Sequence, residues 1–168
     1  NPKYRKAFSP LVEKVSFASF GDMDSLRSVI DEDTAFIILE PIQGESGIIV
    51  APDGFLQEVR KLCDEKGILL IFDEIQAGLG RTGRLWAGEH WNTAPDILCL
   101  AKGIAGGVPM GVTLVRPDIL AAISKGEHSS TFGGNPISCA AGIAALTSIT
   151  EDGLIENSKK MGEIFRKE

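Results

Sequence analysis

Three short, continuous apolar segments most constrain how this chain can fold. They are AFIIL (35–39), ILLIF (68–72) and DILCL (96–100), and a helical pattern lies between the first two, over 52–66. Because polar residues do not alternate within these runs, we expect both faces of the corresponding strands to be buried. Strands that alternate with helices are typical of βαβ units. The sequence therefore predicts an α/β fold, with a mainly parallel sheet covered by helices on both faces.

Two more strands and six helical segments are predicted in the rest of the chain. The additional strands cover 15–20 and 111–115. Helix ends are read from capping residues and from glycine or proline at the boundaries. The predicted helices cover 23–30 with Asp22 as the cap, 52–66 with Gly67 just beyond, 87–91, 117–124, 136–149 and 154 onward. A buried helix can imitate an apolar run, but five residues is a strand length.

Composition restricts the class of protein. The 168 residues are enough for one domain with a core, and 43% hydrophobic with 24% charged residues is ordinary for a globular protein. A net charge of -6 without a Lys/Arg cluster argues against a nucleic-acid or anionic-membrane partner. No apolar run approaches the ~20 residues that span a bilayer, and no signal peptide is visible. With three separated cysteines, Cys63, Cys99 and Cys139, we expect a cytoplasmic protein with reduced thiols and no metal site.

The two ends of the chain predict a fragment of a longer protein. The chain begins at Asn1 instead of methionine and stops at Glu168, within a predicted helix. We therefore expect residues 1–168 to be part of a larger polypeptide.

Ionisable groups follow three of the predicted strands. Glu40 follows AFIIL, Asp73 and Glu74 follow ILLIF, and Lys102 follows DILCL after one alanine. Ligands of open α/β sheets bind at the carboxyl ends of the strands, so these groups should gather at one edge. A lysine near carboxylates is a candidate for ion pairing or imine chemistry. The structural alternatives are a solvated Lys102 and acids that cap the next helix, which is our expectation for Glu74.

Two other classes of function remain open at this point. The segment LLIFDE resembles the magnesium-holding strand of P-loop nucleotide hydrolases, with Asp73 and Glu74 as the acids. That fold also needs G-x-x-x-x-G-K-[ST], which does not occur in the chain but could lie upstream. A binding module without catalysis would leave Lys102 and its glycine-rich surroundings unexplained.

Four segments together resemble one enzyme family. They are LEPIQGESG (39–47), FDEIQAGLGRTG (72–83), LAKGIAGGVPMG (100–111) and SSTFGGNP (129–136). In this order and spacing the chain resembles the class III, fold-type-I aminotransferases, which depend on pyridoxal 5'-phosphate (PLP), and is most similar to the acetylornithine and ornithine aminotransferases. The resemblance implies a homodimer with a shared active site. It also implies that 1–168 is a partial large cofactor-binding domain, with the small domain missing.

The resemblance assigns cofactor roles to four residues. Lys102 matches the lysine that holds PLP covalently and then moves a proton. Asp73 matches the carboxylate that keeps the pyridine nitrogen protonated. Gln76 matches the neutral amide near the phenolic oxygen, and Ile75 matches the aliphatic residue on one ring face, although it could equally be a core residue.

The resemblance assigns further roles outside that group. Thr131, with Ser130 beside it, matches the segment that reaches the cofactor phosphate of the neighbouring subunit. Glu45 matches the acid that pairs with a substrate-binding arginine, and a solvated loop acid is the alternative. Glu40 is expected to orient its loop. Ser129 stands where relatives commonly have glycine, which affects the local turn. The GLGRTG loop (78–83) is expected at an interface or active site.

The implied reaction transfers an amino group from an ω-amine to 2-oxoglutarate. The donors considered are N-acetylornithine, ornithine and a lysine-pathway intermediate, which would place the enzyme in amino-acid biosynthesis such as that of arginine. An aminomutase or a decarboxylase on the same fold is an alternative. The family's upstream phosphate loop, ring-stacking aromatic residue and substrate arginines do not occur in the chain, so we expect the 168-residue polypeptide alone to be inactive.

Overall fold

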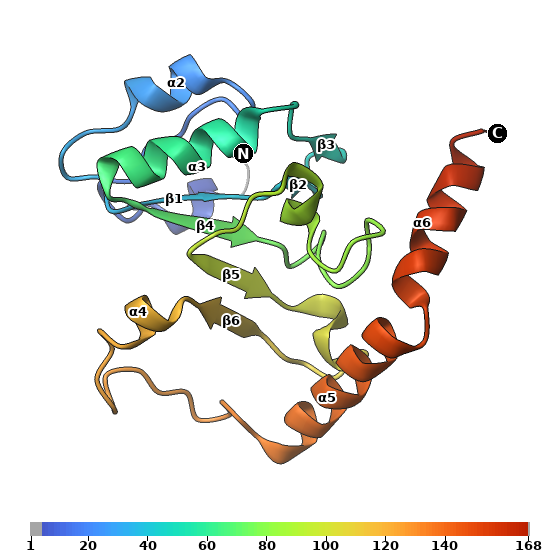
Figure 1. Ribbon diagram of the computed structural model, residues 1–168. Helices are drawn as coiled ribbons and strands as arrows, with labels where there is room; N and C mark the ends of the chain where they lie inside the picture. Colours follow the sequence, from blue (N-terminus) through green and yellow to red (C-terminus); the bar gives the residue numbers. More distant parts are fainter. Residues whose placement is uncertain (1–4, 168) are drawn as a thin grey trace.

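A four-stranded sheet organises the computed structural model, which describes residues 5–167 (Figure 1). The strand order is β1 (Phe36–Leu39), β4 (Leu69–Asp73), β5 (Ile97–Leu100) and β6 (Val112–Val115). The first three strands are parallel and β6 runs antiparallel to β5. The predicted α/β class with a mainly parallel sheet is therefore confirmed. A small antiparallel pair, β2 (Ile42–Gln43) and β3 (Ile49–Val50), follows β1.

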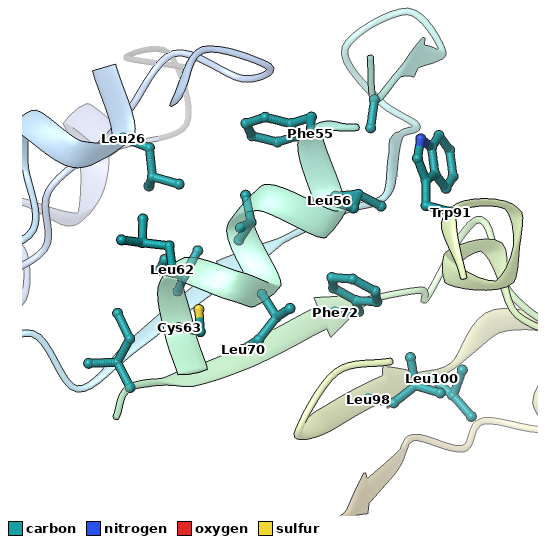
Figure 2. Close-up of a cluster of buried hydrophobic side chains, with 14 of the residues drawn as sticks. Leu26, Phe55, Leu56, Leu62, Cys63, Leu70, Phe72, Trp91, Leu98 and Leu100 are labelled. Atoms are coloured by element: carbon teal, nitrogen blue, oxygen red, sulfur yellow. The ribbon is translucent and has the colours of Figure 1, made fainter. Parts of the chain in front are cut away.

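Helix α3 (Phe55–Lys66) connects β1 to β4 and covers one face of the sheet (Figure 1). Its apolar stripe places Leu56, Val59 and Cys63 out of solvent. Leu56 and Cys63 lie on the side of α3 that faces Leu70 and Phe72 of β4 (Figure 2). Gly67 follows with a φ of 68°, the left-handed conformation that ends many helices. The predicted helix 52–66 is thus confirmed, with a start three residues later.

The remaining helices include those that the sequence predicts, but some of these end earlier than predicted. Asp22 caps α2 (Met23–Ser28) by accepting a hydrogen bond from the Ser25 N–H at 2.9 Å. The predicted helix 117–124 ends early, as α4 (Pro117–Leu120). The others are the 3-10 helices η1 (Lys6–Phe8), η2 (Ala87–Trp91) and η3 (Lys102–Ala105), and the helices α5 (Pro136–Glu151) and α6 (Leu154–Phe165). Glu168, at the end of the predicted last helix, lies outside the described residues.

The strand predicted over 15–20 is wrong. This segment has no regular secondary structure, and Val15 and Phe17 are exposed. Phe20 instead packs edge-on against Phe55 of α3, with 5.6 Å between the ring centroids. Ala18 and Phe20 of this segment pack against the core, without a paired strand among the described residues.

The two faces of β1 differ in burial. Ile37 is buried on the side of α3, whereas Phe36 and Ile38 are 51% and 56% exposed. Because neighbouring side chains in a strand point to opposite faces, the second face of β1 is open in the described chain. The expectation that both faces of this strand are buried is therefore wrong. No helix within residues 5–167 is long and apolar enough to cross a membrane.

Candidate active site

A cavity of about 750 Å³ lies beside Lys102 and is lined by segments that are far apart in the sequence. The β2–β3 hairpin, the 75–82 loop, the start of η3 and the α5–α6 junction each contribute to it. Its lining residues include Ile48, Ile75, Gln76, Leu79, Lys102 and Ser158. This volume lies in the range typical of small-molecule sites.

Lys102 is presented by an uncommon backbone conformation. It begins η3, two residues after β5 ends, and its φ is 48°. Residues other than glycine seldom adopt positive φ, and such strain is concentrated at functional sites. The turn is closed by the Ile104 N–H, which donates to the Ala101 carbonyl at 3.1 Å. The chain therefore leaves the sheet edge with the lysine exposed at the cavity.

Asp73 ends β4, the strand next to β5. Its Oδ1 accepts a hydrogen bond from the Ile75 N–H at 3.0 Å, and in the sheet Asp73 is paired with Cys99. Burial raises the pKa of the Cys99 thiol, and the charge of Asp73 adds to this effect. Asp73 lines a second cavity, of about 820 Å³, between β1 and residues 14–20. Asp73 and Lys102 thus share one sheet edge, as predicted, but they line adjacent cavities.

Gln76 packs against the backbone of the β2–β3 hairpin at Gly44. The Gln76 amide occupies the space that a Cβ on Gly44 would take, so a larger residue at this position would displace the amide. The Gly44 N–H also donates to the Glu40 Oε2 at 2.9 Å. Glu40 therefore orients this loop, as the sequence predicted, and the loop holds Gln76 in the wall of the Lys102 cavity.

Glu74 points away from Asp73 and caps η2. It is 1% exposed, and its two oxygens accept hydrogen bonds from the Ala87 N–H at 2.6 Å and the Gly88 N–H at 2.8 Å. Burial raises the pKa of the Glu74 carboxyl, and these two hydrogen bonds partly oppose the shift. The predicted capping role is confirmed. Because both oxygens are used in this way, the Asp73–Glu74 pair does not present two free acids to a nucleotide's magnesium.

The GLGRTG loop forms one wall of the cavity and rests on α6. The Ser158 hydroxyl donates to the Arg81 carbonyl at 2.9 Å. Gly83, with a φ of 83°, lies so close to Lys159 that an added Cβ would stand 2.8 Å from the Cβ of that lysine. On the other side, the His90 Nε2 lies 3.0 Å from the Thr82 Oγ1. The loop is therefore held by Ser158 and Lys159 of α6 on one side and by His90 of η2 on the other.

Three of the predicted site residues line neither of the two cavities. Ser130 and Thr131 lie in an exposed turn just before α5, and neither lines either cavity. Glu45 is exposed at the tip of the β2–β3 hairpin, next to the cavity-lining Gly44. The structure therefore brings Lys102, Ile75 and Gln76 together and leaves these three outside the group.

Sequence reasoning did not predict the wall formed by the α5–α6 junction. Ile149, Leu154, Ile155 and Ser158 line the cavity, although they are some fifty residues or more from Lys102 in the chain. The available signal was the pair Gly80 and Gly83, because Gly80 packs closely against Ile149 and Ile155 and Gly83 against Lys159 of α6. Within residues 5–167, no group of three or more His, Cys, Asp or Glu side chains is placed to hold a metal ion.

The whole chain matches one known protein family. The family described as Aminotransferase class-III matches residues 1–168. The chain belongs to the class-III aminotransferases. Members of this family are transferases, and relatives of this chain carry the names of acetylornithine and ornithine aminotransferases.

Individual class-III aminotransferases resemble the chain over nearly all of its length. The acetylornithine aminotransferase of Methanopyrus kandleri is 48% identical over 97% of this chain and 42% of its own length. Ornithine aminotransferase 1 of Staphylococcus saprophyticus is 47% identical over 95% of this chain and 41% of its own length. The chain thus spans about two fifths of the length of these relatives.

A solved class-III aminotransferase has nearly the same fold. The ornithine aminotransferase of Toxoplasma gondii superimposes with a TM-score of 0.95 and 38% identity, over 99% of this chain and 40% of that protein. That crystal structure, obtained in the presence of oxidised glutathione, has PLP at partial occupancy in the active site. The match extends the family assignment from sequence to three-dimensional structure.

Proposed function

We propose that the protein containing this chain is a PLP-dependent aminotransferase. It moves an amino group from an ω-amine donor, such as N-acetylornithine, ornithine or a lysine-pathway intermediate, to 2-oxoglutarate. The observation that carries the proposal is Lys102, which is held with positive φ at the end of β5 and lines a cavity with Ile75 and Gln76. Membership of the class-III aminotransferases supports the reaction type, and the names of the relatives support the donor class.

The residues around the cavity fit PLP in chemistry and in size. The cavity of about 750 Å³ offers an amine, an amide and an aliphatic side chain, and the Asp73 carboxylate lies at the same sheet edge. When bound, PLP supplies an electron-accepting ring that stabilises negative charge on the carbon that loses its proton. Gly44 supports the fit, because its missing Cβ leaves room for the Gln76 amide.

Each of these residues has a distinct task in the proposal. The Lys102 Nζ would hold the cofactor covalently, and its amine is the group that would carry a proton at the reacting carbon. Asp73 keeps a proton on the ring nitrogen, because a nearby negative charge favours the protonated ring. The Gln76 amide donates to the phenolic oxygen without adding charge, and Ile75 packs against one ring face.

We assign Ser130 and Thr131 to the active site of a second subunit in a homodimer. Both lie in an exposed turn, outside the cavity of their own chain. Their hydroxyls, together with backbone N–H groups near Gly133, suit a phosphate group. The two subunits would then each complete the other's cofactor site.

Glu45 is assigned to substrate recognition through an arginine. Its exposed position at the hairpin tip leaves the carboxylate free to pair with a cation, and Gly44 beside it lines the cavity. By holding or releasing an arginine, Glu45 would let one site accept both the ω-amine donor and glutamate.

Residues 1–168 form, in this proposal, part of the large cofactor-binding domain, and a small domain completes the enzyme. The enzyme works in the cytoplasm, where thiols stay reduced. The three cysteines, Cys63, Cys99 and Cys139, are all free, which supports this location.

Chemical labelling tests the proposal directly. Borohydride reduction of the PLP-loaded enzyme, followed by peptide mapping, should place the pyridoxyl group on Lys102. A Lys102→Arg variant provides the control, because it keeps the charge but should take up no label. Label on Lys66, Lys125 or another lysine of the wild-type enzyme would overturn the assignment.

A further inference from the structure

Residues with left-handed backbone conformation are concentrated around the Lys102 cavity. Among residues 5–167, the residues other than glycine with positive φ are Lys14, Ile48, Leu79, Asn92 and Lys102. Three of these, Ile48, Leu79 and Lys102, line the same cavity. Strained backbone persists where the surrounding structure enforces it, and it is concentrated at active sites and ligand clamps.

Ile48 is the most unfavourable of the three. A β-branched residue with a φ of 58° is a genuine outlier, because its side chain crowds the backbone in this conformation. Burial does not compensate for this strain, since Ile48 is 65% exposed. Its N–H donates to the Gly44 carbonyl at 3.3 Å, and this turn places the residue in the cavity wall. A strained, exposed apolar side chain at a cavity indicates a contact that the folded chain alone does not supply.

The surroundings of Ile48 indicate what that contact is. Apolar residues from four other elements continue the wall, namely Ile42, Val50, Ile149, Leu154 and Ile155. Among residues 5–167, Lys102 and Arg81 are the charged residues that line the cavity. An amine that reacts at Lys102 therefore has apolar side chains available for its carbon chain, and a cation available for an anionic end.

Leu79 has a related place in the wall. It is partly buried against the core, and its Cδ1 would lie 3.8 Å from a Cβ on Gly103, the residue after Lys102. Leu79 thus packs beside the turn that presents the lysine, whereas Ile48 lies on the hairpin and is free to contact a ligand.

We propose that Ile48 is a specificity-determining residue that packs against the aliphatic chain of the amino donor. This inference rests on the proposed function, because it takes Lys102 as the position of the reacting amine. The strain at Ile48 keeps a branched apolar side chain where a donor with a chain of several methylenes gains contact, and a shorter donor gains less.

Donor discrimination in the holoenzyme tests this role. The readout is the ratio of kcat/KM for N-acetylornithine to that for N-acetyl-2,4-diaminobutanoate, which is one methylene shorter. Ile48→Ala should reduce this ratio by about tenfold, because one methylene in an apolar contact carries roughly that discrimination. Ile48→Val, which keeps the branched shape, should retain most of the ratio, and Ile49→Ala on the same hairpin is the matched control.

An unchanged ratio in an active Ile48→Ala enzyme would overturn the proposal. If that variant does not fold, Ile48→Leu provides the same test, because it keeps the volume but moves the branch. If the kcat/KM ratio of the two donors changes in Ile48→Leu, the contact between Ile48 and the donor is supported. If Ile48→Leu keeps the wild-type ratio, the contact is excluded.

Thermal unfolding, measured beside donor discrimination, distinguishes a contact with the donor from a purely structural role of Ile48. Glycine adopts positive φ without strain, so Ile48→Gly should hold or raise the Tm of the holoenzyme while donor discrimination falls. Ile49→Gly, in the ordinary strand conformation of β3, should lower the Tm. An equal loss of Tm in both variants would contradict the strain on which the proposal depends.

The two proposals fail in different ways. If pyridoxyl label is found on Lys102 but the Ile48 variants discriminate like the wild type, only the inference about Ile48 is wrong. If the label is found on a different lysine, the proposed function itself is wrong.

Discussion

At the scale of single residues, the carboxylate at the end of β4 is the clearest test of the chemistry. Asp73→Asn keeps an oxygen that can accept from the Ile75 N–H, now 3.0 Å from the carboxylate, but it removes the charge. We expect this variant to bind PLP and to lose on the order of 10³-fold in transamination rate, because the ring nitrogen is no longer held protonated. Single-turnover kinetics with cofactor content measured in parallel checks this.

Asp73→Glu is the companion variant. It restores the charge but displaces it by one methylene, so the rate should also fall, although the carboxylate is present. A near-normal rate for Asp73→Asn with cofactor bound would rule out the role of Asp73 as the partner of the ring nitrogen.

Glu74 should make the stability of the protein depend on pH. Burial raises its folded-state pKa above the ordinary value of 4.5. The folded state therefore keeps the proton to a higher pH than the unfolded state does. The associated stability is fully present below pH 4.5 and is lost as pH rises through the raised pKa. Urea unfolding at a series of pH values should show this decline in the wild type and not in Glu74→Gln.

Glu74→Gln should also lower the free energy of unfolding near neutral pH, by roughly 1–3 kcal/mol. Glutamine offers one acceptor where Ala87 and Gly88 now donate to two. Glu89→Gln is the control for this free energy at neutral pH, since Glu89 is exposed and its described hydrogen bond is the one that it accepts from the Trp86 N–H. Parallel pH curves for the wild type and Glu74→Gln would contradict the prediction.

The positions of some site residues could be predicted from the sequence, and those of others could not. Lys102, Asp73 and Glu40 were predicted at one sheet edge because each lies within two residues of the end of a predicted strand, and parallel strands end together. Glu74 was predictable as a cap from the same position. Ile48 was not, because an isoleucine carries no sequence signal for positive φ.

At the scale of elements, a buried ion pair ties β5 to its neighbours. Asp96, 3% exposed, accepts a hydrogen bond from the Leu70 N–H of β4 at 2.7 Å and from Arg60 of α3 at 2.8 Å. It also pairs with Arg116, which precedes α4. One carboxylate thus joins two strands, α3 and the start of α4 at the sheet edge opposite Lys102.

Asp96→Ala should lower the free energy of unfolding by about 3–5 kcal/mol, because it removes the buried partner of Arg60, which keeps only the exposed Asp64, and leaves a strand N–H unpaired. Asp118→Ala, which removes only the exposed partner of Arg116, should have little effect. Urea unfolding of the two variants beside the wild type provides the comparison. Similar midpoints for both would show that the buried position of Asp96 does not matter.

Local sequence patterns predicted elements well where the pattern itself decides the structure. Helices α3 and α5 and the strands β4 and β5 have strong apolar patterns and clear caps, and their existence was confirmed. The segment 15–20 has the composition of a strand, but pairing requires a partner strand elsewhere in the chain. The Ser158–Arg81 hydrogen bond joins residues 77 positions apart, so it depends on the fold as a whole.

At the scale of the whole molecule, large apolar surfaces are open to solvent. Phe36 and Ile38 are exposed on one face of β1, and Ile137 and Ile143 are exposed on α5. Apolar patches of this kind are typical of surfaces that pack against further protein. The relatives are more than twice as long as this chain, which matches about two fifths of their length.

The 168-residue polypeptide by itself should therefore not be a competent aminotransferase. Its exposed apolar faces should make it associate, and it lacks the segments that position the cofactor and the substrate in the proposed enzyme. The measurement is glutamate formation from N-acetylornithine and 2-oxoglutarate with excess PLP, together with sedimentation velocity. Weak PLP binding should survive, and Lys102→Ala in the same polypeptide is its blank. Turnover within about tenfold of a full-length relative would show that residues 1–168 hold a complete active site, which would require a different location for substrate binding.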